Sequence, residues 1–248
     1  MTTLLLHGFT GSPASFDAIV AGLPRSERTL RPMISGHGIA PALATGFAGE
    51  LSRIAAFLRA EDAAPEGGIH VVGYSLGARL ALGLALEHPT LVCRLTLIGP
   101  SAGIEAPEAR HARTVADDAL ASMLRCQGLR PFLDHWEALP LFATQRRLPE
   151  PVRAARRAER ESHDPDALAQ ALAGLSKGRM PSYASRLGEL HVPVTLVAGE
   201  LDLKFVEEAR AMATRIRNAK VVVVPGAGHD VVLEEPSALL GLLNGESA

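Results

Sequence analysis

The stretch that decides the fold is Ile69-His70-Val71-Val72-Gly73-Tyr74-Ser75-Leu76-Gly77. An apolar run typical of a buried strand leads into it, and a helical pattern from Ala78 to His88 follows it. The two glycines let backbones pass close to a strained serine, and the following helix directs its N-terminal amides at the reaction centre. The pattern indicates a nucleophile elbow that presents Ser75. For the pentapeptide alone, an ordinary glycine-rich turn is the alternative.

A serine hydroxyl is a poor acid, so a reactive serine needs a base, and the base needs an orienting carboxylate. Asp202 follows the strand-like run 194–198, and His229 follows the run 221–224 through a glycine-rich loop. The carboxyl ends of parallel strands meet at one edge of a sheet, where active sites of such sheets lie. We therefore predict that Asp202 and His229 complete a triad with the serine. Glu200 is the rival for the acid, and Asp202 is preferred because it lies deeper in the loop.

The first strand-like run, Leu4 to Leu6, ends in the turn His7-Gly8-Phe9. In a fold with a nucleophile elbow, one oxyanion donor is the N–H of the residue after the nucleophile, and the other comes from a loop such as this one. The backbone N–H groups of Leu76 and Phe9 are therefore the predicted oxyanion hole. His7 is expected to be structural and to hold the loop by hydrogen bonds, and the Gly36-His37-Gly38 turn to have a similar shaping role.

Length and composition agree with one enzyme domain. The chain has 248 residues, 47% of them hydrophobic, which is ample for a large core. The net charge of −2 argues against nucleic acid or an anionic membrane as the main partner. Cys93 and Cys126 form neither a disulfide framework nor a metal spacing. With no basic n-region or cleavage site, and no apolar run of spanning length, we expect a cytoplasmic protein. We also expect it to be a monomer.

Continuous apolar runs suit parallel strands that are buried on both faces. Helical patterns such as 50–61 and 78–88 lie between them, which favours a doubly wound α/β sheet with right-handed crossovers. The order serine, acid, histidine is that of the α/β-hydrolase fold. We therefore predict that fold, with a mostly parallel sheet of about six or seven strands flanked by helices. The six strand-like runs are 4–6, 29–34, 69–72, 95–98, 194–198 and 221–224.

The alternation of strands and helices breaks between Pro100 and about Arg186, where helical patterns and prolines replace strands. We predict an inserted helical cap over 101–186 and an α/β core over 1–100 and 187–248; an elaborate surface excursion is the alternative. Arg is frequent in this segment, but the whole chain has 22 Arg against 3 Lys. Composition alone therefore says little about an anionic substrate. Four cap arginines share one helical face: Arg153, Arg156, Arg157 and Arg160.

A resemblance adds to this reading. The cap segment 132–143, with Trp136-Glu137-Ala138-Leu139-Pro140-Leu141-Phe142, resembles the 2-succinyl-6-hydroxy-2,4-cyclohexadiene-1-carboxylate synthases of menaquinone biosynthesis, a branch of the α/β-hydrolases. The likeness continues at 6–12, at 73–79 and at 198–205, and again at 226–229. The core motifs are shared by many hydrolases, whereas the cap segment and the arginine after the elbow are more specific. One departure is Ala78, where the family usually has glycine; its methyl group could tighten the pocket.

The resemblance implies a lyase that eliminates pyruvate from 2-succinyl-5-enolpyruvyl-6-hydroxy-3-cyclohexene-1-carboxylate, with no metal or organic cofactor. It implies that Ser75, activated by His229, acts as the base. By the same resemblance, further residues bind the substrate; they are Arg79, Arg113 and Arg160 at its carboxylates, with Tyr74 and Trp136 lining the pocket. Arg110 and Arg157 are close rivals for the two cap arginines, and a place in the cap core is the alternative for Trp136. A serine esterase or carbon–carbon bond hydrolase, and a non-catalytic binding protein, are the competing functions.

Overall fold

The computed structural model describes residues 2–38, 45–63 and 67–245. Within these ranges the sheet has six parallel strands in the order β2-β1-β3-β4-β5-β6. This agrees with the α/β-hydrolase fold expected from the sequence. The strands are β1 (Thr2–Leu6), β2 (Arg28–Leu30), β3 (Ile69–Tyr74), β4 (Val92–Ile98), β5 (Val194–Gly199) and β6 (Ala219–Val224).

The second strand is shorter than predicted. We expected it over 29–34, but β2 ends at Leu30. Pro32 lies just beyond and has no N–H to give to a sheet ladder. Farther on, the N–H of Ile34 donates to His7 Nε2 at 3.1 Å instead of to a strand. The apolar character of this segment therefore comes from burial beside the first loop and not from sheet pairing.

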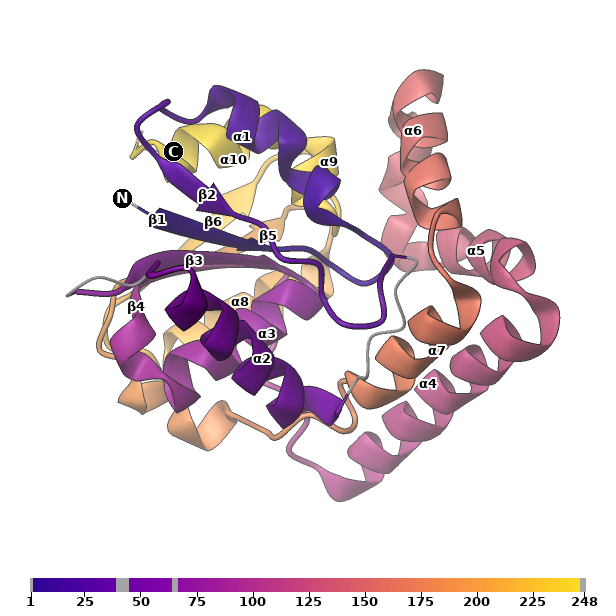
Figure 1. Ribbon diagram of the computed structural model, residues 1–248, viewed down its shortest axis with the longest axis horizontal. Helices are drawn as coiled ribbons and strands as arrows, with labels where there is room; N and C mark the ends of the chain where they lie inside the picture. Colours follow the sequence, from indigo (N-terminus) through magenta and orange to yellow (C-terminus); the bar gives the residue numbers. More distant parts are fainter. Residues whose placement is uncertain (1, 39–44, 64–66, 246–248) are drawn as a thin grey trace.

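Helices cover both faces of the sheet. The α-helices are α1 (Asp17–Gly22), α2 (Gly46–Ala60), α3 (Leu76–Glu87), α4 (Pro107–Gln127), α5 (Leu129–Ala138), α6 (Glu150–Glu161), α7 (Pro165–Gly174), α8 (Leu203–Ala213), α9 (Val231–Glu234) and α10 (Pro236–Leu243). Short 3₁₀ helices are η1 (Pro13–Phe16), η2 (Pro89–Leu91), η3 (Pro140–Arg147) and η4 (Ala184–Glu189). In Figure 1, α1, α9 and α10 lie on one side of the sheet, and α2, α3 and α8 on the other.

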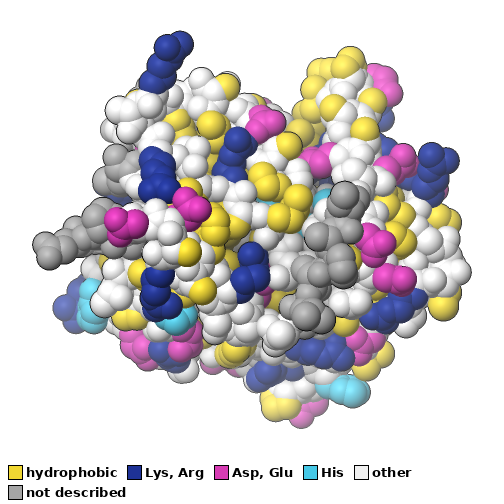
Figure 2. Space-filling model, viewed as in Figure 1, with side chains coloured by type: hydrophobic (Ala, Val, Ile, Leu, Met, Phe, Trp, Pro, Cys, Tyr) yellow, Lys and Arg dark blue, Asp and Glu magenta, His cyan; other side chains and the backbone are white. Residues whose placement is uncertain are grey.

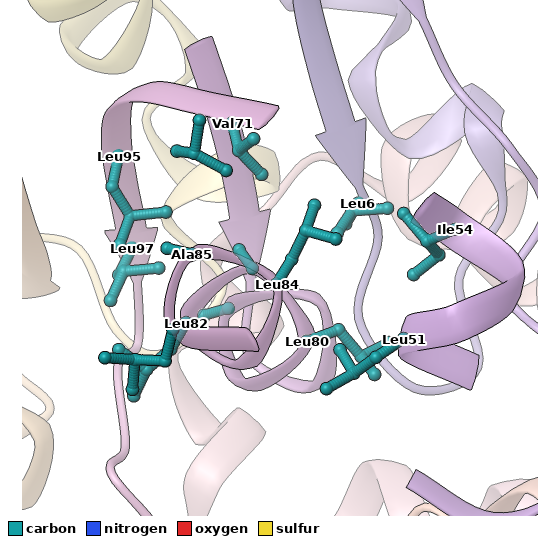
Figure 3. Packing of buried hydrophobic residues seen from close by; sticks show 14 of the residues in the cluster. Leu6, Leu51, Ile54, Val71, Leu80, Leu82, Leu84, Ala85, Leu95 and Leu97 are labelled. Carbon is teal, nitrogen blue, oxygen red and sulfur yellow. The ribbon is translucent and has the colours of Figure 1, made fainter. Parts of the chain in front are cut away.

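Alternation along the strands divides the core into two layers. Leu4 and Leu6 of β1 pack with α2, α3 and α8, whereas Leu5 packs with α1, α9 and α10. Figure 3 shows the first layer, where leucines of α3 face Val71 of β3 and Leu95 of β4. Burial on both faces explains why the strands read as continuous apolar runs.

Helices α4 to α7 lie between β4 and β5, within the predicted cap. In Figure 1 they stand together at the side toward which the strands point. They have a hydrophobic cluster of their own, which includes Leu124, Phe132 and Leu168. The cap therefore covers the carboxyl edge of the sheet. Its exact limits, 101–186, stay a prediction; Met180 and Leu187 on either side of the later limit both pack in the main core.

No helix in the described ranges combines the length and the apolar character needed to cross a bilayer. On the face seen in Figure 2, basic and acidic side chains are interspersed, with no broad field of one sign. This mixed surface fits the small net charge of −2.

Candidate active site

Ser75 lies at the turn between β3 and α3 in a strained backbone conformation. Its φ is 52° and its ψ is −103°, a region that residues with a side chain rarely adopt. The turn is held because the Ser75 N–H donates to Ile98 O at 2.8 Å. The neighbouring glycines are required by crowding: a β-carbon on Gly77 would stand 2.0 Å from Leu6 O, and one on Gly73 would stand 2.2 Å from Gly77 O. The sequence therefore forms the predicted elbow.

A hydrogen-bonded chain runs from this serine into the protein. The Ser75 hydroxyl lies 3.0 Å from His229 Nε2, and His229 Nδ1 lies 2.7 Å from Asp202 Oδ2. In the neutral ring this arrangement has Nδ1–H donating to the carboxylate while Nε2 accepts from the hydroxyl. The histidine is 3% exposed and its ring packs against Phe205, with centroids 4.4 Å apart. The three predicted residues therefore come together in the order that a serine nucleophile or base requires.

Glu200, the rival acid, has a different place. Its side chain is exposed, and its Oε2 accepts from the Gly226 N–H at 2.9 Å. It therefore links the loops after β5 and β6 and does not contact His229. Asp202 is the acid that orients the histidine in this structure.

Three histidines hold the loop that carries Phe9. His7 Nε2 accepts from the Ile34 N–H, as described above. Thr10 is held from two sides: its N–H donates to His37 Nε2 at 3.2 Å, and its carbonyl accepts from His163 Nε2 at 3.1 Å. Burial lowers the pKa of all three rings, that of His7 to about 4, so they remain neutral near pH 7. The expected structural role of His7 agrees with these contacts.

Ser75 opens into a cavity of about 250 Å³ between the core and the cap. Predicted residues that line it are Phe9, Tyr74, Leu76, Arg79, Arg113, Trp136 and His229. Leu76 also begins α3, where the first N–H groups of a helix have no partner within the helix. The structure thus brings both predicted oxyanion residues to the same cavity as the serine.

Two arginines reach this cavity from opposite sides. Arg79 on α3 donates to Leu175 O at 2.8 Å and, among the ion pairs of the described residues, has none of its own. Burial, with a contribution from the charge of Arg113, lowers the pKa of Arg79 to about 10. Arg113 on α4 is 39% exposed and pairs with Asp117 at 2.9 Å. The Arg79 guanidinium therefore stays charged at neutral pH and has no carboxylate of its own among the described residues, whereas Arg113 shares the cavity lining with its partner Asp117.

The third predicted arginine does not reach this cavity. Arg160 on α6 pairs with Glu137 at 2.7 Å and lies over the ring of Phe142. Together with Arg153 and Arg156 it lines a second cavity, of about 130 Å³. The rivals are also elsewhere: Arg110 donates to backbone carbonyls after α7, and Arg157 pairs within the cap. Of the cap arginines considered, Arg113 alone lines the Ser75 cavity.

Comparison with known proteins gives the family. Residues 4–236 match the α/β-hydrolase fold family. The chain is 31% identical over 243 residues to 2-succinyl-6-hydroxy-2,4-cyclohexadiene-1-carboxylate synthase from Enterobacter sp. (strain 638), covering 97% of this chain and 89% of that protein. This chain belongs to the 2-succinyl-6-hydroxy-2,4-cyclohexadiene-1-carboxylate synthase family of α/β-hydrolases. A Bacillus subtilis (strain 168) protein assigned provisionally to the same synthase is 34% identical over 232 residues, covering 93% and 84% of the two chains.

Solved structures share the fold of this chain. MenH from S. aureus superposes with a TM-score of 0.93 at 29% identity, covering 99% of this chain and 92% of that one. A thermophilic esterase from Thermogutta terrifontis, solved with malate bound, gives a TM-score of 0.82 at 25% identity over 99% and 88% of the chains. The same architecture therefore occurs in MenH and in an esterase.

Two cations of the cavity were missed by the sequence reasoning. Lys177, in the loop after α7, pairs with Glu208 at 3.0 Å, and burial lowers the pKa of its ammonium. Lys204 opens α8 beside Phe205. A signal was present, because only Lys177, Lys204 and Lys220 are lysines among the 25 basic Lys and Arg residues. Two of the three line the Ser75 cavity, so lysine in an arginine-biased chain pointed to a special site.

Trp136 lines the Ser75 cavity and also packs in the hydrophobic cluster of the cap, the two alternatives that the sequence left open. Its ring lines the cavity, stacks on Phe132 of the cap cluster at 5.7 Å, and meets Phe9 edge-on at 5.3 Å. Ala78, the departure from the usual glycine of this synthase family, is buried in α3 and is not among the lining residues. Its methyl group is therefore accommodated within the helix packing and lies outside the cavity lining.

Within the described ranges, no group of three or more His, Cys, Asp and Glu side chains is placed to hold a metal ion.

Proposed function

We propose that this protein is a lyase that eliminates pyruvate from 2-succinyl-5-enolpyruvyl-6-hydroxy-3-cyclohexene-1-carboxylate, giving 2-succinyl-6-hydroxy-2,4-cyclohexadiene-1-carboxylate in menaquinone biosynthesis. The observation that carries the proposal is the hydrogen-bonded chain of Ser75, His229 and Asp202, which opens into a cavity lined by four basic side chains and a single carboxylate, Asp117. Family membership over nearly the whole chain supplies the substrate.

The proposed role of Ser75 is that of a base. His229 Nε2 takes the hydroxyl proton, and the Asp202 carboxylate stabilises the imidazolium that forms. Ser75 then removes the carbon-bound proton next to the succinyl ketone. The electron pair of that bond passes through the enolate and forms a ring double bond between C2 and C3. The existing ring double bond moves from C3–C4 to C4–C5, and the bond from C5 to the enolpyruvyl oxygen breaks. The released enolpyruvate accepts a proton and becomes pyruvate, so no covalent enzyme intermediate is needed.

The charge that develops on the ketone oxygen needs stabilisation. The backbone N–H groups of Phe9 and Leu76 are the proposed donors, and one such donor contributes roughly 3–4 kcal/mol in comparable sites. Three histidines fix the Phe9 loop, which keeps this donor in place without reorganisation during the reaction.

The carboxylates of the substrate are proposed to meet a cationic wall. Arg79 and Lys204 come from the core, whereas Arg113 and Lys177 come from the cap. Arg79 has no carboxylate partner among the described residues, and leaving a guanidinium in such a place is costly unless an anion binds it. A substrate with several carboxylates gives this wall a purpose that a neutral ester lacks.

The test is direct. Purified protein is mixed with the enolpyruvyl substrate, and pyruvate release is followed with lactate dehydrogenase and NADH. We expect stoichiometric pyruvate from the wild type, none above background from Ser75→Ala, and an unmodified protein mass in samples quenched during turnover.

A carboxylic ester hydrolase is the second candidate, favoured by the Thermogutta terrifontis esterase. It would use the same serine through an acyl-enzyme. Absence of pyruvate, together with an acyl mass on Ser75 and a burst of product from a simple ester, would replace the lyase by the hydrolase.

We also propose that the protein acts in the cytoplasm, as a monomer, on a small anionic molecule. Both Cys93 and Cys126 are free thiols, which suits a reducing compartment.

A further inference from the structure

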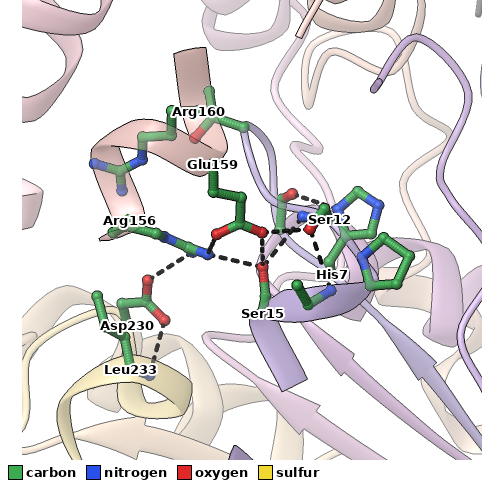
Figure 4. A network of polar contacts seen from close by, with 12 residues as sticks. His7, Ser12, Ser15, Arg156, Glu159, Arg160, Asp230 and Leu233 are labelled. Atoms are coloured by element: carbon green, nitrogen blue, oxygen red, sulfur yellow. Dashed lines mark hydrogen bonds and ion pairs between the residues drawn. The ribbon is translucent and has the colours of Figure 1, made fainter. Parts of the chain in front are cut away.

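Arg156 is a buried arginine where the cap helix α6 meets the core. Its side chain is 6% exposed, and its guanidinium contacts two carboxylates and one hydroxyl. Nη2 lies 3.0 Å from Asp230 Oδ2, while Nη1 lies 2.7 Å from both Glu159 Oε2 and Ser15 Oγ. Figure 4 shows these partners converging on α6 from two separate segments of the core. The arginine therefore joins three parts of the chain at one point.

One of those segments carries the histidine of the site. Asp230 follows His229 directly, and its side chain is 1% exposed. Its Oδ1 accepts from the Leu233 N–H at 3.3 Å and so caps α9. Oδ2 is left for the guanidinium of Arg156 and, at 3.5 Å, the amide of Gln145. The backbone beside His229 is thus fixed by α9 on one side and by the cap on the other.

The second segment carries the oxyanion loop. Ser12 and Ser15 belong to the turn and 3₁₀ helix that follow Phe9. Both hydroxyls donate to Glu159 Oε1, the Ser15 contact at 3.0 Å, and Glu159 is in turn held by Arg156. Because one cap residue pair holds both segments, the Phe9 loop and the His229 loop share a common anchor.

The contacts of Arg156 depend on its positive charge, because two of its partners are the carboxylates of Asp230 and Glu159. Burial opposes the charged form of Arg156, but Asp230 and Glu159 outweigh it and raise the pKa of the guanidinium. Removing the arginine leaves Asp230 buried without its ion pair, a change that is strongly destabilising in general. The neighbouring Arg157 offers a contrast: its ion pairs, with Asp134, Glu137 and Glu161, all lie within the cap.

We infer that Arg156 is a positioning residue: by tying α6 to Asp230 and Ser15, it holds His229 and the Phe9 loop in register with Ser75 when the cap is docked. The inference rests on the proposed function for the identity of the reacting groups. It assigns to the cap a part in assembling the site, beyond covering the cavity.

The experiment compares Arg156→Met, Arg156→Lys and Asp230→Asn with the matched control Arg157→Met. Two rates are measured in each variant, after circular dichroism has shown that it is folded at the assay temperature. The first is kcat for pyruvate release. The second is the rate at which phenylmethanesulfonyl fluoride sulfonylates Ser75, which reports the alignment of Ser75 with His229 and needs no carboxylate binding.

We expect Arg156→Met and Asp230→Asn each to lower both rates by about tenfold or more, because misplacement by about 1 Å can cost about a hundredfold. KM should change less than kcat. The double variant should be little worse than either single one, since both changes break the same contact. Arg156→Lys should recover part of both rates, and Arg157→Met should leave them within about twofold of wild type.

Two results overturn the inference: rates within about twofold of wild type in the folded Arg156 and Asp230 variants, or an equal loss in Arg157→Met. Should Arg156→Met fail to fold, Arg156→Lys and Asp230→Asn decide the matter. Failure of the proposed function is recognised separately, because wild type would then release no pyruvate while the sulfonylation rates still test the positioning role.

Discussion

Ser75 combines a strained backbone with an activated side chain. Its φ of 52° belongs to conformations that cost of order 1–3 kcal/mol for a residue with a β-carbon. The strain is maintained by the Ile98 hydrogen bond and by glycines that admit close backbone contact. In return the hydroxyl reaches His229 Nε2 at 3.0 Å at the mouth of a cavity. The placement of the Ser75 hydroxyl therefore depends on a few residues of the elbow and on His229.

Ser75→Ala and His229→Ala should each reduce pyruvate release by several orders of magnitude while the protein stays folded. The double variant should be little worse, because residues that act as a unit are not additive. Asp202→Asn should also be severe, since it disturbs the ring it orients, whereas Glu200→Gln should have a small effect. Steady-state kinetics check this; additive losses, or a severe Glu200 variant, would contradict the arrangement.

Arg79→Ala should lower kcat/KM for the anionic substrate by at least about tenfold. The change removes a charge-assisted contact of about 1.5–3 kcal/mol, at 1.4 kcal/mol per decade. Arg79→Lys should recover only part, because the planar fork is lost. Turnover of a neutral small ester is the control and should stay equal in wild type and variant. Parallel losses on both substrates would instead indicate damage to the fold or to the Ser75 site.

Lys204→Gln should also lower kcat/KM for the anionic substrate, by about tenfold, because it removes one charge from the cavity wall. Lys220→Gln is the matched control, since Lys220 is an exposed lysine of β6 outside the cavity. The same kinetic assay serves both variants. An equal loss in the two would show that general charge, and not a contact in the cavity, is responsible.

Among the elements, α3 does the most to build the site. It begins directly after Ser75, brings Leu76 to the cavity lining, and carries Arg79 one turn later. The start of α3 packs closely against the end of β1, because a β-carbon on Gly77 would clash with the carbonyl oxygen of Leu6. The register of α3 against β1 therefore places Arg79 and the residues of the predicted oxyanion hole, Phe9 and Leu76, at the same cavity.

Gly77→Ala should destabilise the protein at the upper end of the roughly 1–3 kcal/mol that overpacking costs, because the clash is with backbone that cannot move aside. Gly83→Ala, on the same helix, is the control. There the new methyl meets side chains, the nearest Leu51 Cδ1 at 2.9 Å, and alanine favours the helix. Urea unfolding measures both. A Gly77 variant as stable as the Gly83 variant would mean that α3 can shift along β1.

At the scale of the molecule, parallel strands bring distant residues to one edge. Ser75 follows β3, Asp202 follows β5 and His229 follows β6, and the cap helices lie over the same edge (Figure 1). Buried histidines hold the loops on this side in their neutral form. The stability of the whole fold should therefore depend on pH.

The free energy of unfolding should fall as pH falls from about 6.5 toward 4. His7 has a pKa of about 4 when folded, below the unfolded value of 6.5, so in this window the unfolded chain binds more protons. This stabilisation is complete above pH 6.5, and for His7 alone its loss amounts to on the order of 3 kcal/mol by pH 4. Urea unfolding at pH 7.5, 6 and 5 checks the slope.

His7→Asn should flatten that slope, whereas the exposed His111→Gln should leave it unchanged. Equal stability of the wild type at pH 7.5 and pH 5 would show that the buried rings accept protons without cost.

The sequence by itself predicted a parallel sheet, the elbow and the residues of the Ser75–His229–Asp202 chain, although it made the second strand too long. Each of those signals is local: an apolar run marks a strand buried on both faces, and a polar residue just past its end marks the carboxyl edge. Ser75, Asp202 and His229 could therefore be read one strand at a time, and the chain order joined them. The sequence favoured Asp202 over Glu200 by its depth in the loop but left both open, and the contact of Asp202 with His229 shows which of them orients the ring in the structure.

Only the tertiary structure decided which cap side chains face the cavity. Arg156 and Arg160 lie on one helical face but have different partners: Arg156 meets Ser15 of η1 and Asp230 at the start of α9, whereas Arg160 pairs with Glu137 of α5. Lys177 and Lys204 are far from the elbow along the sequence, yet both side chains line the cavity at Ser75. A helical period fixes which residues share a face, but the partner of that face depends on how whole helices pack, and this is a property of the assembled chain.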